Sequence, residues 1–163
     1  MAPSFAIDVA GLNLAYREVQ REVHPDRFAN ASDAEKRLAA QWATQANEAY
    51  RTLKLPLNRG RYLLSLNGID TEEERNTAMP LEFLTQQMEW REAVFEAKAA
   101  KDEPKLDELA TDQRRAEKLL FVELAAQLAD PTTMCDARVT VRKLRFLEKL
   151  GEEIDLATEE IES

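Results

Sequence analysis

The chain of 163 residues is long enough for one domain or two small ones, and 44% hydrophobic and 33% charged residues describe a soluble protein with a buried core. Four glycines, six prolines and few β-branched runs predict an all-α fold. The net charge of −9 disfavours nucleic acid and anionic membranes as partners. Residues 1–62 carry nine Lys and Arg against seven Asp and Glu, whereas the remainder carries thirteen against twenty-four. The two parts are therefore expected to meet different partners.

The single cysteine, Cys135, excludes an internal disulfide framework and a cysteine-based zinc cluster, and it fits a reducing compartment. The first residues lack a charged segment followed by an apolar one, and no apolar run approaches the ~20 residues that span a membrane. We therefore expect a cytoplasmic protein with no metal site and no cofactor.

Asp8 is suited to cap a helix over residues 9–23, in which apolar residues recur at spacings of three and four. Arg17 and Arg21 lie four apart on its solvent side and form a basic strip that leads towards the end of the helix. The alternative is that they only pair with Glu18 and Glu22, where an exposed pair contributes about 0 to 1 kcal/mol. The apolar stripe consists of Val9, Leu12, Tyr16, Val19 and Val23.

The helix should stop at Val23, because Pro25 has no backbone N–H and disfavours helical geometry for the residue before it. His24, the only histidine of the chain, is therefore expected on a short loop with Pro25 and Asp26. The alternative for this tripeptide is an ordinary turn without a function.

Ser32 and Glu35 predict a capping box at the start of a second helix, which ends near Leu53. The two helices should form an antiparallel hairpin with the histidine at its turn. The expected buried side of the second helix consists of Leu38, Trp42, Ala46, Ala49, Tyr50 and Leu53.

A short apolar helix over residues 58–68 should close with a glycine C-cap, and the polar residues 69–79 predict an acidic connector between two domains. Pro80 is placed to start a helix that runs to about Lys101. At 100° per residue this helix carries two apolar stripes. The second stripe is bordered by glutamates, which would suit an apolar contact with a basic protein. The alternative is that both stripes are core. The first stripe is Phe83, Trp90, Val94 and Ala97; the second is Leu81, Leu84, Met88 and Phe95, bordered by Glu89, Glu92 and Glu96.

Two more helices are predicted, one ending before Pro131 and one starting near Thr132 or Thr133. Phe146 lies about 200° around the last helix from Leu144, so it should point away from the inward row, either exposed or against the first domain. The inward rows are Leu106, Leu109, Ala116, Leu120 and Leu124, and then Met134, Val141, Leu144, Leu147 or Leu150, and Ile154.

Residues 16–28, YREVQREVHPDRF, and 45–53, QANEAYRTL, resemble the second helix, His-Pro-Asp loop and third helix of a J-domain. With RYLLSLNG at residues 61–68 and VRKLRFL at 141–147, the whole chain is similar to the HscB family of J-type co-chaperones in iron–sulfur cluster biogenesis. The resemblance implies two helical domains in an L shape. They are a J-domain over residues 1–68, the connector over 69–79, and a three-helix bundle over 80–163. Members of the family normally begin with a Phe-rich first J-domain helix; the resemblance implies that this helix is truncated here, with only residues 5–8 of the approach retained.

The resemblance further implies a protein that is not an enzyme. Its J-domain would stimulate ATP hydrolysis by the DnaK-type chaperone HscA, and its C-terminal bundle would deliver the iron–sulfur scaffold protein IscU. The implied chaperone-binding residues are His24, Pro25, Asp26, Arg17, Arg21 and Arg27. The implied scaffold-binding residues are Leu84, Met88, Glu89, Glu92 and Phe146, while Thr85 stands where the family commonly has methionine.

Two other functions are weighed against this one. The first is a J-domain co-chaperone or adaptor that serves a different client. The second is an enzyme that uses His24 and Asp26 as an acid–base pair. The enzyme hypothesis is disfavoured, because the chain has no second histidine, no glycine-rich phosphate loop and no metal-ligand spacing.

Overall fold

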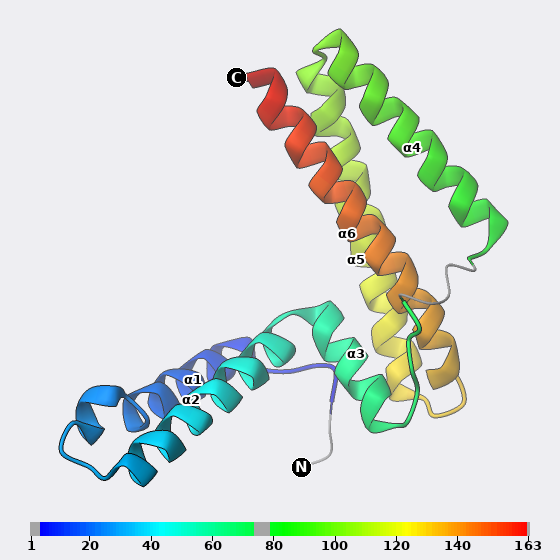
Figure 1. Cartoon of the computed structure of the whole chain (residues 1–163). Coiled ribbons are helices and arrows are strands. Elements are labelled where there is room, and N and C mark those ends of the chain that lie inside the picture. The colour runs from blue at the N-terminus through cyan, green and yellow to red at the C-terminus, as the bar shows by residue number, and fades with distance from the viewer. Residues whose placement is uncertain (1–3, 74–78, 163) are drawn as a thin grey trace. The chain divides into compact units, whose positions relative to one another are not determined.

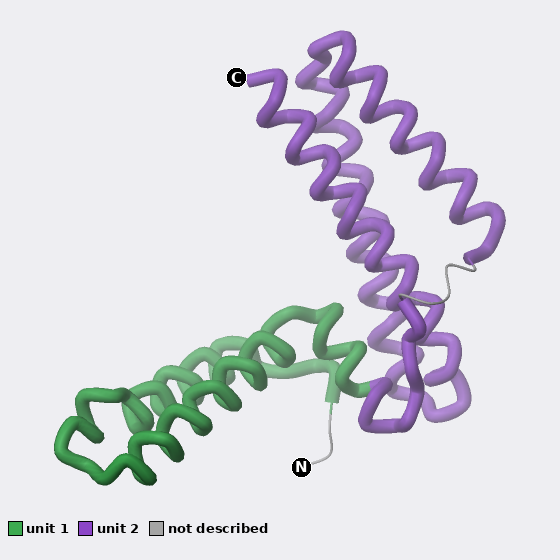
Figure 2. The backbone as a smooth tube through the Cα atoms, viewed as in Figure 1, with its two compact units in different colours: residues 1–63 green, residues 64–163 purple. Residues whose placement is uncertain are grey.

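The structure is a computed structural model that describes residues 4–73 and 79–162. Every secondary-structure element in these ranges is a helix, which confirms the all-α class (Figure 1). The chain divides into two compact units, residues 1–63 and 64–163 (Figure 2). Residues 74–78 of the predicted connector lie outside the described residues, so the division into three parts stays a prediction. None of the described helices is long and apolar enough to cross a membrane.

The first unit contains a helical hairpin of α1 (Val9–Glu22) and α2 (Asp33–Lys54), which lie side by side (Figure 1). Asp8 caps α1, since its Oδ1 accepts a hydrogen bond from the N–H of Ala10 at 3.0 Å. Ser32 and Glu35 form the capping box of α2. The Glu35 N–H donates to the Ser32 hydroxyl oxygen at 3.3 Å, and the Ser32 N–H donates to the Glu35 carboxylate at 2.9 Å. Hydrogen bonds from the hydroxyl and the N–H of Ser32 lower the pKa of Glu35. The hairpin and both predicted caps are confirmed.

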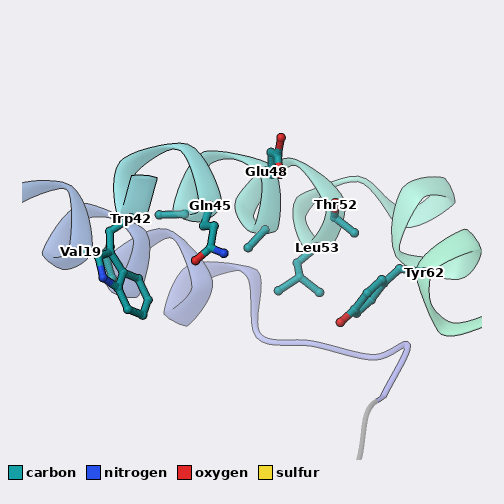
Figure 3. A pocket seen from close by; sticks show the side chains of 9 residues that line it. Val19, Trp42, Gln45, Glu48, Thr52, Leu53 and Tyr62 are labelled. Carbon is teal, nitrogen blue, oxygen red and sulfur yellow. The ribbon is translucent and has the colours of Figure 1, made fainter. Parts of the chain in front are cut away.

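The predicted buried side of α2 is only partly covered. Leu38 and Trp42 are 54% and 55% exposed and Ala49 is exposed, whereas Ala39 is buried. The prediction was wrong at these three positions because the apolar sector of α2 is wider than the surface that α1 covers. The uncovered part borders a largely apolar hollow of about 570 Å³ (Figure 3), lined by Val19, Trp42, Gln45, Ala46, Glu48, Ala49, Thr52, Leu53 and Tyr62.

A buried arginine on α3 (Pro56–Leu66) holds the start of the chain. Arg59 is 7% exposed, and its Nε donates to the carbonyl oxygen of Phe5 at 2.6 Å while its Nη1 donates to that of Leu53. The guanidinium also lies 4.9 Å from the centroid of the Phe5 ring, in a cation–π arrangement. Burial lowers the pKa of Arg59. The segment before α1 is thus tied to the end of α2 through one side chain.

Two predictions concern the ends of helices in this region. Gly68, with φ of 71°, follows α3 and confirms the predicted glycine cap. Residues 4–8 form no helix, so the described chain shows none of the first J-domain helix that the resemblance implies.

The second unit contains α4 (Leu81–Ala100), α5 (Glu103–Ala129) and α6 (Met134–Glu162), and α6 packs against both other helices. The inward rows predicted for α5 and α6 are buried or half-buried, as expected. On α4, the first of the two apolar stripes faces this core, because Val94 and Ala97 are buried and Trp90 packs beside them. The core cluster consists of Val94, Ala97, Leu106, Leu109, Leu147, Leu150, Ile154 and Ala157.

One polar side chain of α4 lies in this interior. Gln87 is 1% exposed, and within the described structure neither its Oε1 nor its Nε2 has a hydrogen-bond partner. A buried polar group without a partner costs about 1 to 3 kcal/mol. Gln87 therefore stabilises the bundle less than an apolar residue of the same size would at this position.

Candidate functional site

The His-Pro-Asp loop is a short preformed turn. His24 has extended geometry, with φ of −62° and ψ of 133°, and Pro25 begins the 3₁₀ helix η1 (Pro25–Phe28). The His24 Nδ1 accepts a hydrogen bond from the N–H of Asp26 at 3.3 Å, and it lies 3.6 Å from Asp26 Oδ2. The side chain of Asp26 is 91% exposed. Proline and histidine thus fix the backbone of the turn and present the carboxylate of Asp26 to solvent.

The expected basic strip lies next to this turn. Arg17, Arg21 and Arg27 line a shallow hollow of about 460 Å³ together with Gln20 and His24. In the described part of the chain these three arginines form no ion pair, so the structure gives no support to the pairing of Arg17 and Arg21 with Glu18 and Glu22. The hollow therefore presents positive charge that no ion pair in the described chain neutralises, beside the exposed carboxylate of Asp26.

Polar and aromatic contacts between α1 and α2 hold the two arms of the loop. The rings of Tyr16 and Tyr50 stack at 4.0 Å with an interplanar angle of 7°. The Tyr16 hydroxyl donates to Asn47 Oδ1 at 2.6 Å and accepts from Gln20 Nε2 at 2.7 Å, and the Tyr50 hydroxyl donates to Asn13 Oδ1 at 2.8 Å. The Asn-Glu-Ala-Tyr sequence therefore has a structural purpose, because Asn47 and Tyr50 both contact α1. We call the set of Asn13, Tyr16, Gln20, Asn47 and Tyr50 the tyrosine clamp.

A second candidate site lies on the solvent side of α4. Met88 is 73% exposed, Leu84 is half-buried, and Glu89 and Glu92 are exposed. The alternative in which both apolar stripes of α4 are core is wrong, since the second stripe faces outward. Thr85 is also exposed on this side, where its hydroxyl donates to the Leu81 carbonyl oxygen at 3.0 Å. An apolar surface bordered by carboxylates is present where the sequence predicts one.

Phe146 is placed differently from the expectation. Its ring meets that of Phe83 edge to face, with centroids 6.2 Å apart and planes at 90°, and the residue is half-buried. The prediction that it is exposed was wrong, because α4 covers this side of α6. The alternative, packing against the first domain, stays a prediction. The Lys143 Nζ lies 5.8 Å from the centroid of the same Phe83 ring. Phe146 therefore supports α4 from beneath the outer surface, and only its uncovered part is available to a partner.

Comparisons with known proteins identify the family. Residues 79–155 match the family model described as the HSCB C-terminal oligomerisation domain. A co-chaperone protein HscB homolog of Paraburkholderia phymatum is 54% identical over 159 residues, which cover 98% of this chain and 90% of the relative. The chain belongs to the HscB co-chaperone family. The HscB homolog of Paraburkholderia xenovorans is 51% identical over the same shares of both chains.

Two solved HscB structures have the same fold. Chaperone HscB from Vibrio cholerae superposes with a TM-score of 0.87 at 34% identity, covering 99% of this chain and 94% of that one. Human co-chaperone protein HscB superposes with a TM-score of 0.85 at 32% identity, covering 95% of this chain and 77% of that one. The all-helical fold implied by the resemblance to HscB is thereby confirmed over almost the whole chain.

The structure also contains residues that sequence reasoning did not connect with the HscB sites. Gln20 joins the basic hollow, and Asn13 joins the tyrosine clamp. Gln20 has a detectable signal, because it lies three residues after Arg17 on the same helical face. Asn13 has none, since its partner Tyr50 is distant in sequence and only the packing of the two helices brings them together.

Proposed function

We propose that this chain is a co-chaperone that stimulates ATP hydrolysis by the DnaK-type chaperone HscA and delivers the iron–sulfur scaffold protein IscU to it. On this proposal residues 1–68 act as the J-domain, residues 69–79 connect, and residues 80–163 hold the scaffold in the cytoplasm. The observation that carries the proposal is the preformed His-Pro-Asp turn, whose Asp26 carboxylate is 91% exposed beside unpaired arginines.

The geometry supports a direct contact of this turn with the chaperone. Pro25 restricts φ, and the hydrogen bond from the Asp26 N–H to His24 closes the turn before any partner binds, so little conformational entropy is lost on binding. Asp26 would bind a chaperone cation, and Arg17, Arg21 and Arg27 would face an acidic surface. Such a contact accelerates hydrolysis only if it binds more tightly to the hydrolysis-competent state of the chaperone.

The outer face of α4 supports a weak, reversible contact with the scaffold. Burial of Leu84 and Met88 would contribute about 1.5 to 3 kcal/mol each. Association itself costs about 4 to 15 kcal/mol. Phe146 would add less than a fully exposed phenylalanine, because it already packs on Phe83. Glu89 and Glu92 would mainly orient a basic partner and raise the association rate. Modest affinity suits a protein that must release what it delivers.

The test of the chaperone contact is a single-turnover ATPase assay with the purified HscA-type chaperone of the same organism. Asp26→Asn keeps the size of the side chain and removes its charge, and loss of one charged hydrogen bond of about 1.5 to 3 kcal/mol should reduce stimulation tenfold or more. His24→Gln should also reduce it, because the cap of the turn changes. Asp107→Asn, an exposed site on α5, is the matched control. Stimulation by Asp26→Asn equal to that of the control, with unchanged helix content, would remove Asp26 from this role.

The test of the client is recovery from a cell lysate on immobilised protein. The wild type should retain the scaffold, and the Leu84→Ala, Met88→Ala double variant should lose it. A double variant of Leu119 and Val122 to alanine, at two positions of α5 that are 66% and 64% exposed, is the control. Retention of a different protein in place of the scaffold would favour the adaptor for another client. We expect no catalysis by the chain alone, because the one ring nitrogen of His24 next to Asp26 is used to cap the turn.

A further inference from the structure

The apolar surface of α4 extends beyond the five residues assigned to the scaffold. Leu81 is 80% exposed, and Met88 and Phe95 are each 73% exposed. These three residues are seven apart, and at 100° per residue Leu84 falls within about 60° of arc with them. Together they form one straight row, which we call the outer row. At 1.5 Å per residue it is about 21 Å long from Leu81 to Phe95.

The two flanks of the outer row differ in charge. On one flank Glu89, Glu92 and Glu96 are exposed. On the other flank Arg91 and Lys98 are paired with α6: Arg91 Nε lies 3.0 Å from Glu153 Oε2, and Lys98 Nζ pairs with Glu160. The row is therefore bordered by net negative charge on one side and by neutralised charge on the other.

We propose that the docking surface for the scaffold is the whole outer row, with Leu81 and Phe95 as contact residues in addition to Leu84 and Met88. The occupant is then an apolar surface about four helical turns long, with basic side chains along one edge that faces Glu89, Glu92 and Glu96. This inference rests on the proposed function, because it takes the IscU-type scaffold as the partner. Phe95 is the largest side chain of the row and is therefore its expected anchor.

Charge argues against a second copy of this chain as the occupant. In an antiparallel pair of α4 helices the same flank of both copies would meet, so Glu89, Glu92 and Glu96 would face their own equivalents. In a parallel pair the acidic flank would face Arg91 and Lys98, whose charges are already neutralised by α6. The whole chain also carries a net charge of −9, which opposes self-association. Because the matching family is that of an oligomerisation domain, self-association is nevertheless an outcome to measure.

The experiment is isothermal titration of the full-length protein with the purified IscU-type scaffold of the same organism. Met88→Ala tests the proposed scaffold site, and Phe95→Ala tests its extension. Leu119→Ala is the matched control, because the Leu119 side chain on α5 is 66% exposed. Phe95→Ala should raise Kd about tenfold or more, as expected of an interface anchor, and Leu119→Ala less than about twofold. Glu96→Gln should reduce the dependence of Kd on salt, whereas Glu159→Gln on α6 should not.

The outcomes separate the inference from the function it rests on. If Met88→Ala weakens binding while Phe95→Ala matches Leu119→Ala, the extension is wrong and the scaffold site stands. If the wild type does not bind the scaffold, both are wrong. If sedimentation shows a dimer of the wild type that Phe95→Ala converts to a monomer, the row is a self-association surface and the inference is overturned.

Discussion

In the hairpin of α1 and α2 a single helical residue, Ala39, is buried, whereas α6 of the bundle alone buries nine, from Ala137 to Ala157. The hairpin is held instead by the tyrosine clamp and by side-chain caps, and it leaves the apolar hollow beside Trp42 open (Figure 3). Apolar burial is the dominant stabilising contribution in folding, so the bundle should be the more stable unit. The proposed chaperone site is therefore built on directional polar contacts and the proposed scaffold site on a packed core.

The largest expected effect comes from removing core volume in the bundle. Leu144 is fully buried, and Leu144→Ala should lower the free energy of unfolding of this unit by about 2 to 5 kcal/mol. Each unit contains one of the two tryptophans, Trp42 and Trp90, so each can be followed by fluorescence after the other is changed to phenylalanine. In urea, Leu144→Ala should shift the transition reported by Trp90. In the hairpin, Leu38→Ala at a position 54% exposed should shift the Trp42 transition far less. Equal shifts would contradict the difference between the units.

A gain of stability is expected at the polar residue inside the bundle. Gln87→Leu keeps about the same volume and removes two unsatisfied polar atoms, so the unfolding free energy should rise by about 1 to 3 kcal/mol. The measurement is the urea midpoint reported by Trp90. Gln86→Leu, at the exposed neighbouring position, is the control for a change in overall hydrophobicity. An unchanged or lower midpoint in Gln87→Leu would mean that the amide is satisfied in solution, for example by a buried water.

The tyrosine clamp should give a smaller effect, confined to the hairpin. Tyr16→Phe keeps the ring stacked on Tyr50 but removes the hydroxyl that donates to Asn47 and accepts from Gln20. Each hydrogen bond contributes about 0.5 to 1.5 kcal/mol, and the exposure of these two hydrogen bonds to solvent places the expected loss near the lower end. Hydrogen exchange of the α1 and α2 amides should become faster while exchange in α5 and α6 stays the same. Tyr62→Phe, which leaves the clamp intact, is the comparison; faster exchange throughout the chain would show that the two units open together.

The same contrast explains how much could be predicted from the sequence. Caps are local, so Asp8, Ser32 and Pro25 marked the helix ends correctly, and the periodic rows of α5 and α6 marked the bundle core. Leu38, Trp42 and Ala49 were assigned to a core because periodicity shows which side of a helix is apolar but not whether another element covers it. Phe146 was misplaced for the reverse reason, since its distance from the inward row gave no sign that Phe83 of α4 would cover it.

The candidate sites follow the same rule. His24, Pro25 and Asp26 are adjacent in the chain, so the geometry of their turn follows from local chemistry. The outward direction of Leu84 and Met88 was one of two alternatives, and the packing of the opposite stripe decided it. The tyrosine clamp joins residues that are 31 and 37 positions apart, and no local pattern in a single sequence indicates such pairs.

The smallest expected effect depends on pH and returns to the bundle. Burial and, to a lesser degree, the charge of Glu148 raise the pKa of Glu117 on α5 above its ordinary value of 4.5. The folded state therefore binds this proton more tightly than the unfolded state does. The stabilisation of the folded state that comes from protonated Glu117 is present below pH 4.5 and is lost as the pH rises through the folded-state pKa. Glu117→Gln keeps the side chain neutral, so at pH 7 the variant should be more stable than the wild type, and at pH 4 the two should converge.

Urea unfolding of both proteins between pH 4 and pH 7, followed by Trp90, measures this difference, and Glu123→Gln on the exposed side of α5 controls for the change in net charge. A difference that does not vary with pH would show that Glu117 is as well solvated in the folded bundle as in the unfolded chain, and that burial does not raise its pKa.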